Sequence, residues 1–230
     1  MSNKHQNRRR RGRENSNDPQ IKTSKTLTWV LRHSAPSLGL EIGQDGYIQL
    51  DQLLQHSHPK LRSLKEDIIR EVVISNDKQR FALIEKDDGI WYIRANQGHS
   101  IESIDPYQLL TPIDPEKLKT LTLLHGTYFD PWSKHISTEG LSKMSRNHIH
   151  FAKGMPSENG VISGMRKSCD IYIYMDATKC SETGIQFFES TNGVLLTAGV
   201  ENTGMLPSEY ISHVVSKTNE IILDQRYSSS

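Results

Sequence analysis

The sequence predicts an α+β fold with two lobes, and three observations lead to this prediction. Three short segments with helical spacing of apolar residues come first, and a strand–turn–strand pattern follows them. Beyond a Pro-rich stretch, the apolar residues fall mainly into short runs typical of strands. The chain of 230 residues is long enough for one large domain or two small ones. We therefore expect a tail over 1–22, a first lobe over 23–110 and a second over 120–225.

Composition excludes several classes of protein. Hydrophobic residues make up 35% of the chain, and no apolar run approaches the ~20 residues of a membrane span. The polar, basic N-terminus lacks the apolar segment of a secretory signal. Cys169 and Cys180 are the two cysteines, which excludes a disulfide scaffold and a cysteine zinc site. We expect an intracellular protein, cytoplasmic or nuclear, without membrane association.

The N-terminal tail differs in charge from the rest of the chain. Residues 1–13 carry six Lys and Arg and no acid, so residues 14–230 sum to −5 when the whole chain is +1. We expect residues 1–22 to be disordered because they lack apolar periodicity. The tail is either a nuclear address, a phosphate-binding arm or a solvated segment. A polyanionic partner would bind either the tail or a few cationic side chains at defined positions in the folded part.

The first lobe begins with an amphipathic helix. Ser24 is its predicted N-cap, and Leu27, Val30 and Leu31 share one face. Arg32-His33 should lie at its last turn, before Pro36. The other predicted elements are strand 47–50, helix 50–54, helix 64–73 and strands 80–85 and 90–95. Three helices followed by a hairpin are typical of a winged helix, a module that often binds nucleic acid.

The second lobe is predicted to have a β-rich core. Residues 111–115 read as a linker between the lobes. The predicted strands are 121–127, 149–152, 171–176, 193–197 and 211–215, with short helices at 129–140 and 158–167.

Four polar clusters remain once the familiar catalytic signatures are found to be absent. They are rich in Arg and His, and lie at 32–33, 76–81, 97–100 and 144–150. A helix dipole or a turn explains part of the first three, and a structural histidine is the plain explanation for the fourth. Alternation, however, places His148 and His150 on one face of a strand. Several Arg and one His that converge would form a dianion site, since guanidinium groups bind phosphate oxygens bidentately. No Asp/Glu pair stands out as a metal clamp, so we expect no metal.

Taken together, these motifs resemble the tRNA 2′-phosphotransferase family over roughly residues 23–215. Eight motifs occur in the family's order: Leu31-Arg32-His33, Asp45-Gly46-Tyr47, Asn76-Asp77-Lys78-Gln79-Arg80-Phe81, Arg94-Ala95-Asn96-Gln97-Gly98-His99-Ser100, His125-Gly126-Thr127, Arg146-Asn147-His148-Ile149-His150, Gly160-Val161-Ile162-Ser163-Gly164-Met165-Arg166 and Asn192-Gly193-Val194-Leu195-Leu196-Thr197.

The resemblance implies a fold and a reaction. The fold is a winged-helix-like lobe followed by an ADP-ribosyltransferase-like lobe. In the reaction, the splice-junction 2′-phosphate of ligated tRNA attacks NAD⁺ and releases nicotinamide. The ribose 2″-hydroxyl of the resulting RNA 2′-phospho-ADP-ribose then attacks phosphorus. The products are 2′-hydroxyl RNA and ADP-ribose 1″,2″-cyclic phosphate. The implied partners are therefore 2′-phosphorylated tRNA and NAD, without an obligatory protein partner.

The resemblance also implies roles for particular residues. The family's essential set falls on Arg32, His33, Arg80 and Arg146. The first three would hold the RNA 2′-phosphate from the first lobe. Arg146 would complete the cage from the second lobe and favour the transesterification step.

For NAD, the resemblance implies a different set of residues in the second lobe. Phe187 and Phe188 either flank the nicotinamide pocket or pack in the core. The implied NAD-binding residues are His125, Gly126, Thr127, His150, Ser163 and Arg166.

Two alternatives stay open: a non-catalytic RNA-binding winged-helix protein and a protein ADP-ribosyltransferase.

Overall fold

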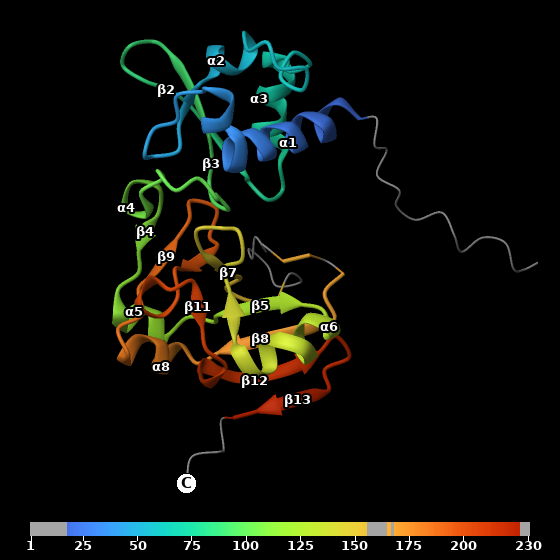
Figure 1. The fold of residues 1–230 in the computed structure, drawn as a ribbon, viewed down its shortest axis with the longest axis vertical. Helices are drawn as coiled ribbons and strands as arrows, with labels where there is room; N and C mark the ends of the chain where they lie inside the picture. Colours follow the sequence, from blue (N-terminus) through green and yellow to red (C-terminus); the bar gives the residue numbers. More distant parts are fainter. Residues whose placement is uncertain (1–17, 156–164, 167, 226–230) are drawn as a thin grey trace, which may run out of the picture.

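The computed structural model describes residues 18–155, 165–166 and 168–225, and Figure 1 shows an upper first lobe and a lower second lobe. The first lobe combines short helices with a small antiparallel sheet. The strand order of this sheet is β1-β3-β2. Its elements are α1 (Pro19–Trp29), η1 (Val30–Ser34), η2 (Pro36–Leu38), β1 (Ile48–Gln49), α2 (Leu50–Leu54), α3 (Glu66–Ser75), β2 (Phe81–Glu85) and β3 (Trp91–Ala95).

The first helix begins earlier than the sequence pattern predicts. Asp18 is the N-cap, its carboxylate accepting from the backbone N–H of Gln20 at 2.8 Å, and Pro19 occupies the first turn. The prediction of Ser24 as N-cap is wrong, and residues 19–22 are helical rather than part of the tail. An Asp-Pro pair is a strong helix start, because the carboxylate satisfies a free N–H and proline needs none. The expected disorder of residues 1–17 lies outside the described residues.

The rest of the first lobe follows the predicted pattern. α3 carries Glu66 and Asp67 in its first turn, where the helix dipole favours acids. β2 and β3 pair in register from Phe81 with Ala95 to Glu85 with Trp91. Leu27, Leu31 and Ile93 are fully buried in the core beneath them. The hairpin therefore packs on the same apolar cluster as α1.

The second lobe contains two four-stranded sheets and a two-stranded one. The strand orders are β13-β12-β8-β5, β4-β9-β10-β7 and β11-β6. A bridge between Leu124 and Ala152 joins the two larger sheets. The elements are α4 (Pro106–Leu109), β4 (Thr111–Pro112), α5 (Pro115–Lys119), β5 (Leu124–Thr127), α6 (Phe129–Pro131), η3 (Trp132–Ile136), α7 (Ser137–Glu139), β6 (Leu141–Ser142), β7 (Ile149–Phe151), β8 (Ile171–Met175), α8 (Ala177–Glu182), β9 (Phe187–Glu189), β10 (Leu195–Thr197), η4 (Val200–Asn202), β11 (Met205–Leu206), η5 (Ser208–Tyr210), β12 (Ile211–Ser216) and β13 (Ile221–Asp224).

This architecture confirms the α+β class and corrects the predicted linker. Thr111 and Pro112 form an edge strand that pairs with Glu189 and Phe188 of β9. An edge position tolerates proline because its missing N–H faces outward. Asp114 then caps α5, with Pro115 in the first turn. The helix predicted over 158–167 falls mostly outside the described residues.

Strands β9 and β10 tie the two lobes together. Phe187 and Leu195 belong to the second-lobe core, whereas Phe188 and Leu196 belong to the first-lobe core. Adjacent strand residues point to opposite faces, so one sheet serves two cores. Both phenylalanines are buried and pack in these cores.

No helix in the described part of the chain has the length and apolar character needed to cross a membrane.

Candidate anion-binding site between the lobes

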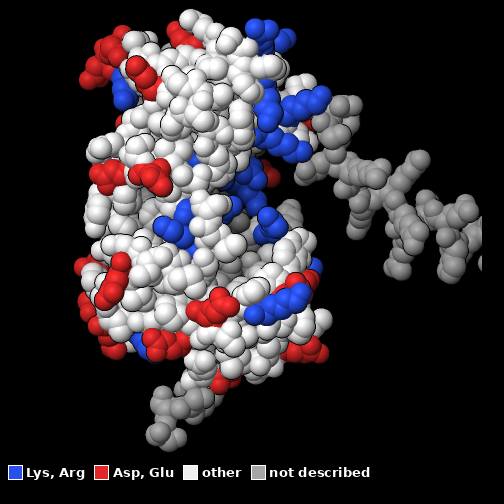
Figure 2. All heavy atoms as spheres, viewed as in Figure 1, with Lys and Arg blue, Asp and Glu red and all other residues white. Residues whose placement is uncertain are grey.

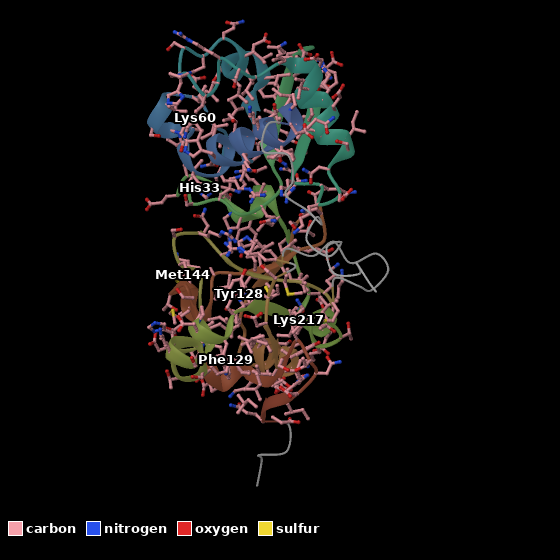
Figure 3. All side chains as sticks on the ribbon, turned by 90° about the vertical axis from the view of Figure 1, so that its right-hand side faces the viewer. His33, Lys60, Tyr128, Phe129, Met144 and Lys217 are labelled. Carbon is pink, nitrogen blue, oxygen red and sulfur yellow. The ribbon has the colours of Figure 1, made fainter. Side chains whose placement is uncertain are left out.

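Arg32 and His33 lie where the first helix changes its pitch. After α1 the backbone continues as the π-helical turn η1, closed by a 3.0 Å hydrogen bond from Ala35 N to Val30 O. Single π-helical turns occur frequently at functional sites. Pro36 follows directly and prevents the helix from continuing. Figure 3 shows His33 at the edge of the first lobe nearest the second lobe.

Arg32 is a buried cation, and no ion pair within the described part of the chain engages it. Its side chain packs against Gly98, and a Cβ there would lie 3.0 Å from Nη1. Its Nε and Nη2 atoms are buried without a hydrogen-bond partner among the described residues. Burial, then Arg146 and Arg80, lower the pKa of Arg32 to about 10. Unsatisfied donors on a buried cation are costly, so the arrangement favours a bound anion.

His33 is more exposed and is oriented by a hydroxyl. Its Nδ1 lies 2.9 Å from Ser100 Oγ, and the backbone N–H of Ser100 donates to Arg32 O at 2.9 Å. Burial lowers the pKa of His33, and the positive charges of Arg32 and Arg146 lower it further. An anion placed among these groups would reverse the electrostatic part of that shift.

Arg80 approaches the same point from the mouth of the hairpin. Its Nη1 donates to Asn76 Oδ1 at 3.1 Å. The preceding residue, Gln79, has a left-handed backbone with φ 43°, and Asn96 Nδ2 donates to its carbonyl at 2.7 Å. A non-glycine residue in this conformation costs about 1 kcal/mol or more, so surrounding contacts must hold the turn that aims Arg80.

Arg146 completes the group from the second lobe, on the loop between β6 and β7. Met144, two residues earlier, is left-handed with φ 55°. Asn147 fixes the loop to the first lobe: its backbone N–H donates to His99 O at 2.8 Å, and Nδ2 donates to Ile101 O at 2.9 Å. Burial, followed by the charge of Arg166, lowers the pKa of Arg146. The loop is thus held across the interface.

The predicted set of four converges in the structure. His33 and Arg80 line the same cavity, and the charges of Arg80 and Arg146 both act on Arg32. Figure 2 shows Lys and Arg side chains gathered across the middle of one face, where the lobes meet. Like charges brought together without acids destabilise the free protein, and a phosphate dianion would neutralise them.

Two cavities in the second lobe adjoin this group. They have volumes of about 640 Å³ and 280 Å³, and both are lined by His125, Thr127, Arg146 and His150. The smaller cavity also includes Gly126 and Arg166. All predicted second-lobe site residues that the structure describes therefore lie around Arg146. Ser163 lies outside the described residues.

The imidazole of His125 is hydrogen-bonded to the backbone carbonyl of His150, the other histidine that lines both cavities. His125 Nδ1 lies 2.9 Å from His150 O. This contact requires the N–H on Nδ1, because a carbonyl oxygen only accepts. Burial lowers the pKa of both imidazoles, and a buried Nε2 of His150 has no partner among the described residues. Their rings are therefore neutral near pH 7, and His150 has one polar atom to offer a ligand.

Gly126 has a packing role as well as a place in the cavity wall. A Cβ at this position would lie 2.6 Å from Met165 Sδ and 3.0 Å from Cys169 Sγ. The glycine is therefore required by its protein neighbours, and the predicted reason, close approach to a ligand, is not needed to explain it.

The residues that hold the arginines in position were harder to predict from the sequence than the arginines themselves. Gly98, with φ 88°, makes room for Arg32, and Asn147 and Asn96 hold the two Arg-bearing turns. Position in the sequence was their only signal: Gly98 and Asn147 lie within polar clusters, and Asn96 directly precedes one. Among the described residues, no group of three or more His, Cys, Asp or Glu is arranged to hold a metal ion.

Comparison with known proteins adds independent evidence. Residues 18–199 match the family described as "RNA 2'-phosphotransferase, Tpt1 / KptA family". The chain belongs to this family. The family match begins at Asp18, the residue that caps α1.

Individual relatives agree with the family match. The protein named "tRNA 2'-phosphotransferase 1" from Danio rerio is 44% identical over 206 residues, 89% of each chain. The "tRNA 2'-phosphotransferase" of Saccharomyces cerevisiae is 38% identical over 201 residues, 86% of this chain and 85% of the yeast protein. A relative from Schizosaccharomyces pombe is 44% identical over 205 residues, which are 89% of this chain and 54% of that protein. The chain thus spans about half the length of the last relative.

Proposed function

We propose that this chain removes the splice-junction 2′-phosphate from ligated tRNA and transfers it to NAD. As a member of its family the chain is an RNA 2′-phosphotransferase. The observation that carries the proposal is the convergence of Arg32, His33, Arg80 and Arg146 between the lobes. Within the residues that the structure describes, no ion pair engages these four side chains, and two further cavities lie beside them.

In this proposal the first lobe holds the phosphate. Arg32 and Arg80 donate to its oxygens from fixed positions, and His33 adds a hydrogen bond or a charge. Such pre-oriented donors stabilise the charge of the reacting phosphate at no reorganisation cost. The unpartnered Nε and Nη2 atoms of Arg32 are the donors that a phosphate would satisfy.

Arg146 has a separate role in the proposal. It adjoins both the phosphate group of cations and the two second-lobe cavities. It is therefore placed to neutralise charge that develops on phosphorus when the RNA 2′-oxygen departs. No proton transfer by a guanidinium is needed for that role.

The second-lobe cavities fit the polar parts of NAD. Arg166 supplies a cation for the pyrophosphate, and His150 Nε2 is a buried polar atom without a described partner. His125 and Thr127 line both cavities and would contact the ribose. When bound, NAD supplies an electrophilic anomeric carbon with nicotinamide as leaving group. We accordingly regard the second lobe as ADP-ribosyltransferase-like and the first as winged-helix-like, as α1, α2, α3 and the β2–β3 hairpin suggest.

The proposed reaction balances in two displacements. An oxygen of the RNA 2′-phosphate bonds to the anomeric carbon, and the bond to nicotinamide breaks. The neighbouring ribose hydroxyl then bonds to phosphorus, while the bond from phosphorus to the RNA 2′-oxygen breaks and that oxygen takes up a proton. RNA leaves with a 2′-hydroxyl, together with ADP-ribose 1″,2″-cyclic phosphate.

A product assay tests the proposal. The protein is incubated with RNA bearing one internal 2′-phosphate, with and without NAD, and the products are separated. Conversion to 2′-hydroxyl RNA that requires NAD and yields the cyclic phosphate supports it. RNA bound but unchanged would favour a binding module, and label from NAD appearing on protein would favour a protein ADP-ribosyltransferase.

A further inference from the structure

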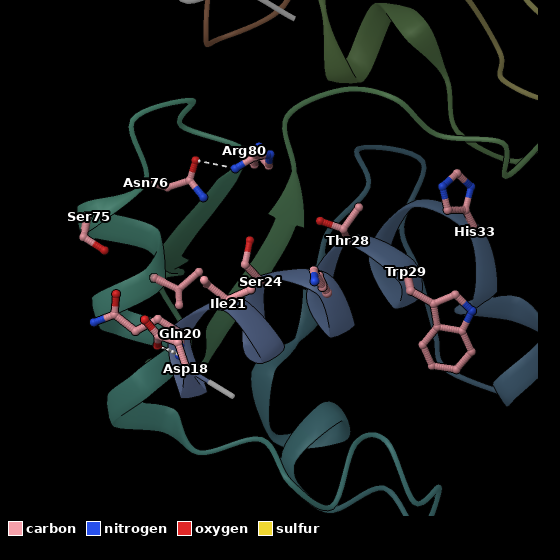
Figure 4. Close-up of a pocket in the computed structure, with 12 residues that line it drawn as sticks. Asp18, Gln20, Ile21, Ser24, Thr28, Trp29, His33, Ser75, Asn76 and Arg80 are labelled. Carbon is pink, nitrogen blue, oxygen red and sulfur yellow. Dashed lines mark hydrogen bonds between the residues drawn. The ribbon is translucent and has the colours of Figure 1, made fainter. Parts of the chain in front are cut away.

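A third cavity opens from the anion site on the side away from the second lobe. Its volume is about 580 Å³, and it runs along α1 and the C-terminal end of α3. His33 and Arg80 line it, whereas Arg146 and the histidines of the second lobe do not. This cavity, which we call the α1–α3 groove, therefore shares the first-lobe half of the anion site and none of the second-lobe half. Figure 4 shows its residues.

The walls of the α1–α3 groove combine apolar side chains, those of Ile21, Trp29 and Val72, with a row of mostly neutral polar ones. Ser24, Lys25 and Thr28 come from α1, and Ser75 and Asn76 from the end of α3. Figure 4 shows the hydroxyl groups of Ser24 and Thr28 on the side of α1 where Arg80 lies. Within the described residues, no hydrogen bond or ion pair engages the side chains of Lys25 and Thr28. These donors are therefore available to a ligand.

This chemistry matches a sugar–phosphate backbone. Lys, Ser, Thr and Asn side chains supply most protein contacts to phosphate and sugar, independent of base sequence. Ser24 and Thr28 are four residues apart, so they lie on one face of the helix about one turn from each other. His33 follows after slightly more than another turn, which gives the row a length of about 14 Å at 1.5 Å per residue. The row ends at the proposed 2′-phosphate site.

We infer that the α1–α3 groove binds the single-stranded RNA that flanks the 2′-phosphate, with Lys25 and Thr28 contacting its backbone. The inference rests on the proposed function and adds the path of the RNA chain. The acidic side chain in the groove is Asp18, at the end of α1 remote from His33, and it is already engaged as the N-cap. Among the described residues that line the groove near the anion site, the side chains are neutral or basic.

Two RNA ligands and two variants test the inference. The short ligand is a dinucleotide with an internal 2′-phosphate, and the long ligand is a single-stranded RNA with the same dinucleotide at its centre. Lys25→Glu reverses a charge in the groove. The matched control is Lys65→Glu, which changes the net charge equally at the opposite end of α3, where Lys65 is exposed. Binding is measured by fluorescence anisotropy without NAD, and KM is measured in its presence.

The inference predicts an effect confined to the long RNA. Lys25→Glu should raise its Kd and KM about tenfold, as the loss of a charged hydrogen bond implies, and leave the dinucleotide and NAD unchanged. The slope of log Kd against log salt should fall by about 0.7 for the long RNA, the value for one lost phosphate contact in a single strand. Lys65→Glu should change neither quantity.

Other results would overturn the inference or the proposed function separately. Equal weakening of short and long RNA by Lys25→Glu, or no weakening of either, would mean that flanking RNA does not occupy the groove. If the long RNA bound through Lys25 but the wild-type protein left its 2′-phosphate in place with NAD present, the groove assignment would stand and the proposed function would fail.

Discussion

The two halves of the anion site differ in how firmly the protein holds them. Arg32 is 8% exposed, lies on a helical turn and packs against Gly98, and Arg80 is hydrogen-bonded to Asn76. Arg146 is more exposed than Arg32 and lies on a loop, although Asn147 ties that loop to the first lobe. A buried cation is fixed before the substrate arrives, whereas an exposed one can follow the reacting group. We therefore propose that the first lobe supplies most of the phosphate binding, and that Arg146 completes the group and acts mainly in the second displacement.

The largest expected loss of activity comes from a substitution in the first-lobe half of the site, which the protein holds firmly. Arg80→Ala should lower kcat/KM for 2′-phosphate removal about 1,000-fold, because it removes a fixed charged donor from the reacting phosphate. The free energy of unfolding should change by less than about 1 kcal/mol. Steady-state kinetics and urea unfolding measure the two quantities. Arg62→Ala, at an exposed position of the same lobe, is the control. Full activity in Arg80→Ala would remove this residue from the site.

A glycine substitution tests whether fixed geometry matters in that half. In Gly98→Ala the new methyl carbon would lie 3.0 Å from Arg32 Nη1, and kcat/KM should fall about 100-fold, as for displacement of a catalytic group by about 1 Å.

Gly89→Ala is the matched control for this change. Gly89 also has a positive φ, 74° against 88° for Gly98, but nothing lies within 4 Å of its added Cβ. Both variants should lose about 1 kcal/mol of stability from backbone strain, and only Gly98→Ala should lose activity. Equal activities would mean that Arg32 need not be held in place.

The role of Arg146, in the more exposed half of the site, should appear in the relative rates of the two displacements. Arg146→Ala should slow the second displacement more than the first, because Arg146 borders both the phosphate cations and the second-lobe cavities. RNA 2′-phospho-ADP-ribose should then accumulate in single-turnover reactions analysed by gel electrophoresis, and turnover should fall about 100-fold. A uniform slowing of both steps, without an intermediate, would contradict the division of roles.

The smallest expected effect concerns stability and pH. Burial, followed by the charge of Arg32, lowers the pKa of His99 to about 3. Its folded-state pKa is thus below the unfolded value of about 6.5, so the unfolded chain binds the proton more readily. The stabilising contribution is complete above pH 6.5 and is lost as the pH falls toward 3.

Urea unfolding at pH 6.5 and pH 5 measures this contribution. Between these values His99 should account for about 2 kcal/mol of lost stability, which His99→Asn should abolish. His135→Asn changes an exposed histidine and serves as the control. An unchanged pH dependence in His99→Asn would show that this imidazole titrates normally.

The cations of the site could be predicted from the sequence, whereas the scaffold that unites them could not. Arg80 stood out because no turn or strand required a charge at its position, and Arg32 and Arg146 stood out as members of clusters rich in Arg and His. Their convergence depends on long-range contacts such as Asn147 with Ile101, and no local pattern encodes these. The helices and strands were found where periodicity was strong, as in α3 and the β2–β3 hairpin.

The errors in the predicted fold have local physical causes. The tail was judged by composition, which concealed the cap and proline that begin α1 at Asp18-Pro19. Residues 111–115 were predicted as a linker because of their prolines, but Pro112 is compatible with the edge strand β4. The sharing of β9 and β10 between two cores also depends on tertiary packing, so the sequence suggested more separate lobes than the structure has.

The central claim is that Arg32, His33, Arg80 and Arg146 together hold the RNA 2′-phosphate. A crystal structure of the protein with a 2′-phosphorylated dinucleotide tests it most directly. We predict that the phosphate lies between the lobes, with its oxygens within hydrogen-bonding distance of all four side chains. A 2′-phosphate bound elsewhere, or bound by the second lobe without Arg32 and Arg80, would contradict the claim.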